Sequence, residues 1–382
     1  MLYFDHCATT PVDEEVLRAV TEVMRTAYGN PSALHKLGVE AERLVNKARS
    51  VIAGQLSVRP EEIIFTSGGT ESNNLAVKGA AYYYRSRGTH LITTRIEHPS
   101  VMEPFRQLEE EGFQVTYLDA DQSGAASVAQ LAQALRPDTI LVSMMHVNNE
   151  TGRIQPVAEA GALLKAYPRI LFHVDAVQSI GKLPLALSDW GIDLCSISAH
   201  KIRGPKGAGV LYRRNGVQLR PLLAGGGQEQ GARSGTENVP LIVGTAKAVR
   251  LACERQPAAA LKLRQLRRQL LDLLAREPRL VYNGSLQETD MAPQVVNVSA
   301  PGLKAEAVVH ALEELGICIS TKSACSSGKE EPSSVLLAMG ADRQRAVSPL
   351  RISLSEAHEP EQIQQLAAKL SAALDRVAAV SR

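Results

Sequence analysis

Short apolar runs alternate with longer amphipathic segments along the first two thirds of the chain. Each run has the length of a strand and ends in polar or glycine residues, which is typical of buried strands. These runs are residues 61–68, 89–96, 113–120, 139–147, 170–177, 194–201 and 208–214. The segments between them with helical periodicity are residues 70–87, 100–112, 127–136 and 156–167. Apolar strands between helices predict an α/β fold with a mostly parallel sheet covered on both faces.

The pattern changes near the start of a long helical segment, residues 239–276, which is rich in Leu, Arg and Gln. A second αβ region follows it. Its predicted elements are strands at 294–300 and 316–322 and helices at 305–315 and 360–380. We therefore expect a large domain over residues 14–255 and a smaller α/β domain formed by residues 1–13 and 256–382.

Composition narrows the functional classes. The chain has 382 residues, 45% of them apolar and 21% charged, which is ordinary for a folded protein. A net charge of +2 gives no basis for a nucleic-acid or anionic-membrane partner. No apolar run approaches the roughly 20 residues of a membrane span, and the N-terminus lacks a signal-peptide pattern. Five scattered cysteines form no CxxC pair. We expect a cytoplasmic protein without disulfides or a metal site.

Polar residues whose side chains could bind a ligand or take part in a reaction lie at or just after the predicted strand ends. They are Thr70, His98, Asn149, Asp175, Gln178 and Lys201. In open α/β sheets, ligands bind outside the carboxyl ends of the strands. The sequence therefore predicts a binding site that these residues share.

Lys201 ends a strand and precedes a glycine-rich turn, so it can present its amine into a cleft and form a Schiff base. Taken alone, an exposed surface lysine is the commoner interpretation. Asp175 can hold a pyridinium nitrogen protonated, and Gln178 can bond a ring hydroxyl. A helix N-cap is the alternative for Asp175. His98 can stack on a cofactor ring and move protons, or simply bond backbone near a turn.

Gly69 and Thr70 open a helix after a strand, where backbone amides and the helix dipole form an anion site. Ser198 and His200 can complete this phosphate cup, although glycine-rich turns are also common in purely structural roles. Arg351 is a candidate carboxylate clamp, with a structural salt bridge as the alternative.

Cys325 lies in the segment STKSACSSGKEEPSS, whose composition is typical of an exposed loop. Lys322 and Lys329 nearby favour its thiolate form. Cys195, Cys253 and Cys318 lie in predicted strands and a helix and are expected to be structural. Cys7, in a polar N-terminal turn, is harder to assign.

Taken together, these motifs resemble the cysteine desulfurases of the NifS/IscS type. The matching segments run nearly from end to end and include YFDHCATTPV, FTSGGTESNN, HVDAVQ, SAHKIRGPKGAGVLY, GGGQEQGARSGTEN, SACSSG and LRISL. Those proteins are pyridoxal 5'-phosphate (PLP) enzymes of fold type I in the class V aminotransferase group. The resemblance implies a seven-stranded large domain, a homodimer, and Lys201 as the Schiff-base lysine.

The resemblance also implies a role for each candidate residue. The phosphate is bound by Gly69, Thr70, Ser198 and His200, with Thr236 reaching in from a partner subunit. Asp175 pairs with the ring nitrogen, Gln178 with the ring oxygen, and His98 stacks on the ring. Asn149 lies by the ring oxygen and, with Arg351, holds the substrate carboxylate. Asn30 and His35 line the cleft.

The implied activity converts L-cysteine to L-alanine and places the sulfur on Cys325 as a persulfide. A sulfur-acceptor protein, either an iron–sulfur scaffold or a tRNA-thiolation or cofactor-thiolation enzyme, would receive it. Arg203 replaces a tyrosine common in the family, and the short C-terminal tail favours a dedicated acceptor over an iron–sulfur scaffold. The alternatives are a selenocysteine lyase or another class V PLP enzyme, and a PLP-fold protein that serves only as a binding platform.

Overall fold

A seven-stranded sheet forms the centre of the larger domain in the computed structural model, which describes residues 1–322 and 331–380. Its strands follow the order β2 (Ile63–Thr66), β8 (Gly209–Arg213), β7 (Leu194–Ser198), β6 (Leu171–Asp175), β5 (Thr139–Met145), β3 (His90–Thr94) and β4 (Gln114–Leu118). Strand β8 runs antiparallel to both neighbours, and every other neighbouring pair is parallel. The predicted, mostly parallel sheet is confirmed.

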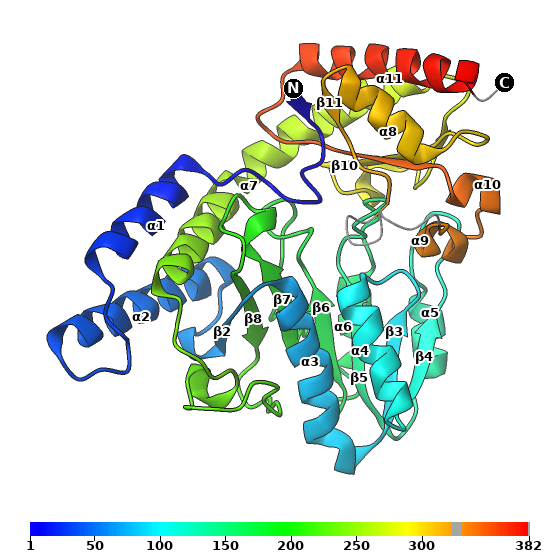
Figure 1. Cartoon of the computed structure of the whole chain (residues 1–382). Coiled ribbons are helices and arrows are strands. Elements are labelled where there is room, and N and C mark those ends of the chain that lie inside the picture. Colours follow the sequence, from blue (N-terminus) through cyan, green and yellow to red (C-terminus); the bar gives the residue numbers. More distant parts are fainter. Residues whose placement is uncertain (323–330, 381–382) are drawn as a thin grey trace.

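Helices cover both faces of this sheet (Figure 1). On one face lie α3 (Gly69–Tyr84) and α4 (Pro99–Glu110). On the other lie α2 (Lys36–Leu56), α5 (Val128–Ala134), α6 (Val157–Leu164) and the first half of α7 (Val239–Leu274). Successive strand residues feed opposite clusters, as Leu141 and Val142 of β5 do. Burial on both faces explains why these strands are apolar runs without alternation.

The smaller domain combines the C-terminal third of the chain with its first residues. Strands β12 (Pro349–Ser353), β10 (Val295–Ser299) and β9 (Val281–Tyr282) form an antiparallel sheet. Strand β1 (Leu2–Tyr3) pairs in parallel with β11 (Ile317–Cys318). Helices α8 (Ala305–Glu314) and α11 (Pro360–Val380) pack on this domain with the second half of α7.

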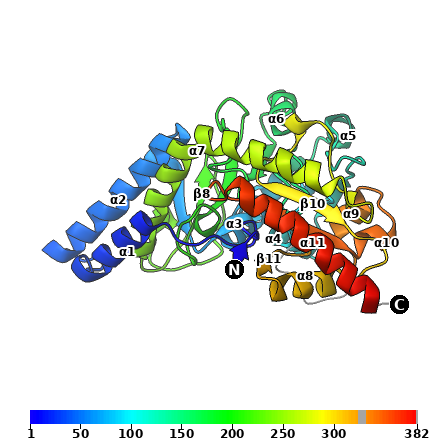
Figure 2. The ribbon, with the colours of Figure 1, turned by 90° about the horizontal axis from the view of Figure 1, so that it is seen from above.

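Helix α7 joins the two domains. Figure 2 shows it running from α1 (Glu14–Thr26) and α2 to the small domain beside α11. Phe4 and Leu263 share the buried core of the small domain, so the N-terminal segment is packed there before the chain enters α1. The N-terminal segment, together with both domains, therefore borders the pocket described below.

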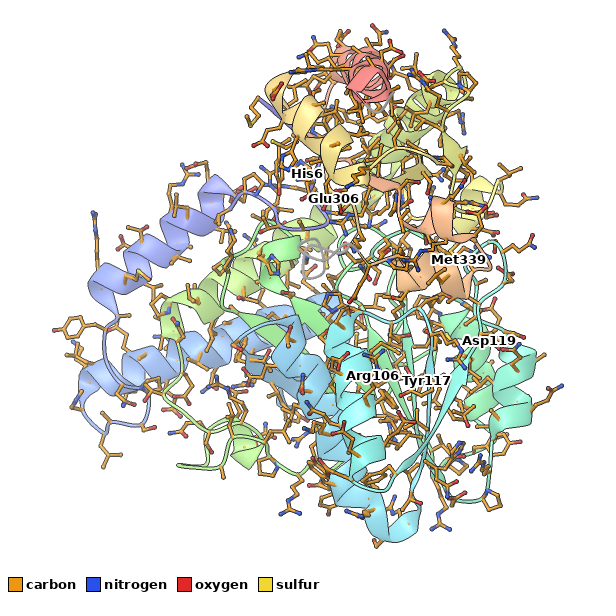
Figure 3. The ribbon with its side chains drawn as sticks, turned by 45° about the vertical axis from the view of Figure 1, so that its right-hand side comes forward. His6, Arg106, Tyr117, Asp119, Glu306 and Met339 are labelled. Carbon is orange, nitrogen blue, oxygen red and sulfur yellow. The ribbon has the colours of Figure 1, made fainter. Side chains whose placement is uncertain are left out.

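Two short helices, α9 (Ser334–Ala338) and α10 (Arg343–Ala346), bring the chain after residue 331 back to the large domain. Met339, labelled in Figure 3, packs with Ile96 and Met145 beyond the carboxyl ends of β3 and β5. Across residues 1–322 and 331–380, no helix is long and apolar enough to cross a membrane.

Candidate active site

A pocket of about 160 Å³ lies at the carboxyl ends of β5, β6 and β7, below the small domain. Ten of the residues chosen from the sequence line it, namely Gly69, Thr70, His98, Asn149, Asp175, Gln178, Ser198, His200, Lys201 and Arg351. We call this the cleft pocket. The structure therefore brings these strand-end residues together in one place.

Asp175 is the last residue of β6 and is almost fully buried. Its Oδ1 accepts a hydrogen bond from the Val177 amide at 2.9 Å, and its Oδ2 accepts one from Asn73 Nδ2 at 2.8 Å. Burial raises the pKa of this carboxyl group, while these bonds and Lys201 act in the opposite direction. A cation placed against Asp175 would stabilise its ionised form.

Lys201 follows β7 in a short 3₁₀ turn, Ala199–Lys201, and its side chain is half-buried. Its Nζ donates hydrogen bonds to the carbonyl oxygens of Cys7 at 2.5 Å and Ala8 at 2.8 Å. Gln178 Nε2 also donates to the Cys7 carbonyl, at 3.1 Å. The N-terminal segment therefore supplies backbone acceptors that can hold the lysine as an ammonium ion.

His98 is the N-cap of α4, and its Nδ1 accepts a hydrogen bond from the Ser100 amide at 3.1 Å. Burial, and then the cations Lys201 and Arg351, lower its pKa to about 4. The imidazole is therefore neutral at physiological pH. His98 therefore caps a helix, as one sequence interpretation expected, and also lines the cleft pocket.

The start of α3 forms an anion cradle. Gly68 places no side chain over the first turn of this helix, and within the described residues the first turn has no side-chain cap. A Cβ on Gly69 would lie 2.9 Å from Val177 Cγ2, so only glycine leaves the cradle open. Ser198 Oγ is buried here and has no hydrogen-bond partner within the described part of the chain. An oxyanion would supply the missing acceptor.

Arg351 of β12 is 1% exposed and closes the pocket from the small domain. Its Nη1 donates to the Asn149 carbonyl and its Nη2 to Asp5 Oδ1, both at 3.0 Å. Its Nε and Asn149 Oδ1 are buried without a partner in residues 1–322 and 331–380. Arg351 therefore forms the salt bridge that one sequence interpretation expected, and its Nε–H remains available to a ligand.

Several residues assigned from the resemblance lie away from the cleft pocket of this single chain. Asn30, His35 and Thr236 are exposed and do not line it. His35 caps α2, and Asn30 Oδ1 accepts from the Ser32 amide. Cys325 lies outside the described residues.

Seven further residues line the pocket, and among them Asn73, Ser100 and Cys7 carry side chains to which sequence reasoning gave no role in the site. The first two lie within helices α3 and α4 and carry no strand-end signal. The spacing of two residues between His98 and Ser100 at a predicted helix start was the available clue. Cys7 is 3% exposed and burial raises its thiol pKa, so it is a buried wall residue.

Comparison with known proteins identifies the family. The family model for aminotransferase class V matches residues 2–366. The cysteine desulfurase IscS of Glaesserella parasuis is 43% identical, covering 95% of this chain and 90% of the relative. A solved NifS-like protein superposes with a TM-score of 0.92 at 40% identity, covering 98% and 99% of the two chains. The structure titled SspA in complex with cysteine gives a TM-score of 0.82 at 38% identity, covering 93% and 99%.

The chain therefore belongs to the class V aminotransferase family and, within it, to the cysteine desulfurases. The fold class and the kind of enzyme predicted from the sequence are both confirmed at this level.

Proposed function

We propose that this protein binds PLP in the cleft pocket and converts L-cysteine to L-alanine, passing the sulfur through Cys325 to an acceptor. The observation that carries the proposal is the meeting of Lys201, Asp175, His98 and Arg351 in one pocket. The structural neighbour solved with cysteine supports the choice of substrate.

The donor set of the pocket fits PLP. Gly69, Thr70, Ser198 and His200 would hold the phosphate, and the unpartnered Ser198 Oγ is one of the donors this requires. Asp175 would pair with the ring nitrogen, and Gln178 and Asn149 lie on the wall available to the ring oxygen. Lys201 would hold the aldehyde carbon covalently. When bound, PLP supplies an electron sink for bonds at the substrate Cα and Cβ.

Substrate orientation depends on Arg351 and Asn149. The free Nε of Arg351 is the donor left for a substrate carboxylate, since Asn149 and Asp5 occupy its two Nη groups. Fixing the carboxylate fixes the direction of the Cα–H bond, an effect that can lower a barrier by several kcal/mol. Lys201 Nζ takes the Cα proton, and the carbonyls of Cys7 and Ala8 hold the resulting ammonium. His98 faces the same space as a neutral donor.

The sulfur step belongs to Cys325. Its thiolate forms a bond to the substrate sulfur while the Cβ–Sγ bond breaks, and the electron pair of that bond stays with the organic product, which takes up a proton to become alanine. Ser320 is paired to Arg351 through two backbone hydrogen bonds of 2.7 and 3.2 Å. Cys325 lies five positions after Ser320, a reach of about 17 Å for extended chain.

The assembly is a homodimer in this proposal. Tyr28, Leu34, Leu222 and Leu223 are exposed apolar side chains on the segments that carry the remaining assigned residues. A partner subunit packed on them would cover this surface and could deliver Thr236 to the phosphate. The cytoplasm is the proposed location. The sulfur acceptor is a protein of iron–sulfur assembly or of tRNA or cofactor thiolation.

The proposal is tested by measuring the alanine and persulfide that the PLP-loaded protein forms from L-cysteine with a dithiol reductant present. The wild type and Cys253→Ala should produce alanine at similar rates, because Cys253 lies in α7 away from the pocket. Cys325→Ala should bind PLP but form neither product. Normal turnover by Cys325→Ala would remove the role given to that residue. Turnover restricted to L-selenocysteine would favour the lyase, and PLP binding without any turnover would favour the platform protein.

A further inference from the structure

Asn73 lies between the two groups that would flank a bound ring. It has no solvent exposure, and its Nδ2 is 2.8 Å from Asp175 Oδ2 and also 2.8 Å from Ser100 Oγ. Ser100 Oγ is in turn 2.8 Å from His98 Nδ1. A continuous chain of side chains therefore links the carboxylate at the end of β6 to the imidazole at the start of α4.

The direction of each bond in this chain follows once Asp175 is ionised, the form that a cation placed against it would stabilise. The ionised carboxylate can only accept, so the Asn73 amide turns its NH₂ group toward Asp175 and gives its second proton to Ser100 Oγ. Rotating the amide would set Oδ1 against the carboxylate. Having accepted one bond, Ser100 Oγ still has its own proton, which it donates to His98 Nδ1.

His98 Nδ1 therefore faces two donors, the Ser100 hydroxyl at 2.8 Å and the Ser100 amide at 3.1 Å. A nitrogen that accepts in this way carries no proton, so the ring proton of neutral His98 is on Nε2. The charged groups that act on the ring are Lys201 and Arg351, both cations that disfavour a second ring proton.

The Ser100 hydroxyl is not needed to start the helix. Ser127 and Ser333 are N-caps whose hydroxyls accept from the amides of Gln130 and Leu336. In α4 the N-cap is His98, and Ser100 is two residues further on. Within the described part of the chain, its hydroxyl bonds the side chains of Asn73 and His98, which points to a role in the site instead of a role in helix capping.

We propose that Asn73 and Ser100 are positioning residues that hold His98 as the neutral Nε2–H tautomer and align it with Asp175. His98 then enters the reaction as a hydrogen-bond donor at Nε2, not as a base. The part of this inference that concerns the reaction rests on the proposed function, but the tautomer does not.

Nitrogen NMR of holoenzyme labelled with ¹⁵N-histidine tests the tautomer directly, with His98→Gln used to assign the signal. The wild type and Ser100→Thr should both show a protonated Nε2 and a bare Nδ1. Asn73→Asp replaces the donor by an acceptor, so the Ser100 proton turns away from His98 and its oxygen faces Nδ1. The titration midpoint of His98 should then rise by at least one pH unit.

A second variant separates this relay from the simple effect of an added charge. In Asn73→Asp/Ser100→Ala the carboxylate is present but no hydroxyl can transmit the reversal, so the rise should be clearly smaller. An equal rise in both variants, or a wild-type spectrum with the proton on Nδ1, would overturn the proposal.

Kinetics give an independent readout. Ser100→Ala should lower kcat about 3- to 30-fold with little change in KM, less than the roughly 10²–10⁴-fold that loss of a whole acid–base group costs, because His98 itself remains. Ser100→Thr should restore kcat. Ser127→Ala is the matched control, since it removes a serine hydroxyl from the start of α5, outside the pocket. An unchanged kcat in Ser100→Ala would refute the kinetic part. Absence of cysteine turnover in the wild type would refute the proposed function and leave the NMR result standing.

Discussion

Arg351→Lys offers a sharp test of the carboxylate clamp. The guanidinium of Arg351 donates to the Asn149 carbonyl and to Asp5 Oδ1 at 3.0 Å each, and keeps Nε for a ligand. A lysine ammonium is a point charge without a planar fork, so it cannot serve three acceptors in these directions. We expect the variant to lose the bond to the substrate carboxylate while keeping a cation opposite Asp5.

The magnitude follows from the kind of bond that is lost. A hydrogen bond to a charged group contributes about 1.5–3 kcal/mol. Since each 1.4 kcal/mol is a factor of ten, kcat/KM for L-cysteine should fall about 10- to 150-fold. The carboxylate does not react and is held in the ground state as in the transition state. Part of the loss should therefore appear in KM, and the rest in kcat because the same contact orients the Cα–H bond.

Initial rates of alanine formation against L-cysteine concentration measure this effect. Arg345→Lys is the matched control. Arg345 also donates two hydrogen bonds, to Asn283 Oδ1 at 2.5 Å and to the Tyr282 carbonyl at 2.7 Å, but it lies outside the cleft pocket. Its variant should lower Tm with kcat/KM within about threefold of wild type. A KM unchanged in Arg351→Lys, or equal losses in both variants, would refute the assignment of Arg351 as the clamp.

Three further predictions concern stability. Gly161→Ala should cost about 1–3 kcal/mol in thermal or urea unfolding, because the added Cβ would lie 1.8 Å from the Trp190 carbonyl oxygen. Gly54→Ala, at an open helical position, should instead stabilise the protein by about 0.5–1 kcal/mol. Equal effects of the two substitutions would contradict the packing argument. Burial raises the pKa of Glu97 to about 8, so the stability contributed by its protonated carboxyl is lost as the pH rises toward that value. Because glutamine stays neutral, Glu97→Gln should have a higher Tm than wild type at pH 9. Burial lowers the pKa of His173 to about 3, so the unfolding free energy should fall as the pH drops below 6.5, by up to about 1.4 kcal/mol per pH unit from this ring. The slope of the unfolding free energy against pH should be smaller in His173→Gln. An identical slope in the variant would show that the ring is charged in the folded state.

Much of the fold could be predicted because burial on both faces leaves a strong local signature. The strands of the central sheet are apolar runs, and α11 has the predicted bounds, 360–380. Helices α1 and α2 were not anticipated. In α2, Gly38 and Gly54 lower the intrinsic helix propensity, and the helix forms because residues such as Ile52 bury against the large domain.

By itself, the sequence determined which residues end the strands, and in a parallel sheet that is enough to gather Asp175 and Lys201 at one edge. Only the tertiary structure decided which groups those side chains contact. Asp5 and Arg351 are 346 positions apart and meet because the N-terminal segment packs into the small domain. Asn73 joins Asp175 to the Ser100–His98 pair because α3 and α4 start beside the same strand ends. Contacts of this kind depend on the packing of whole elements, so no local pattern in the chain encodes them.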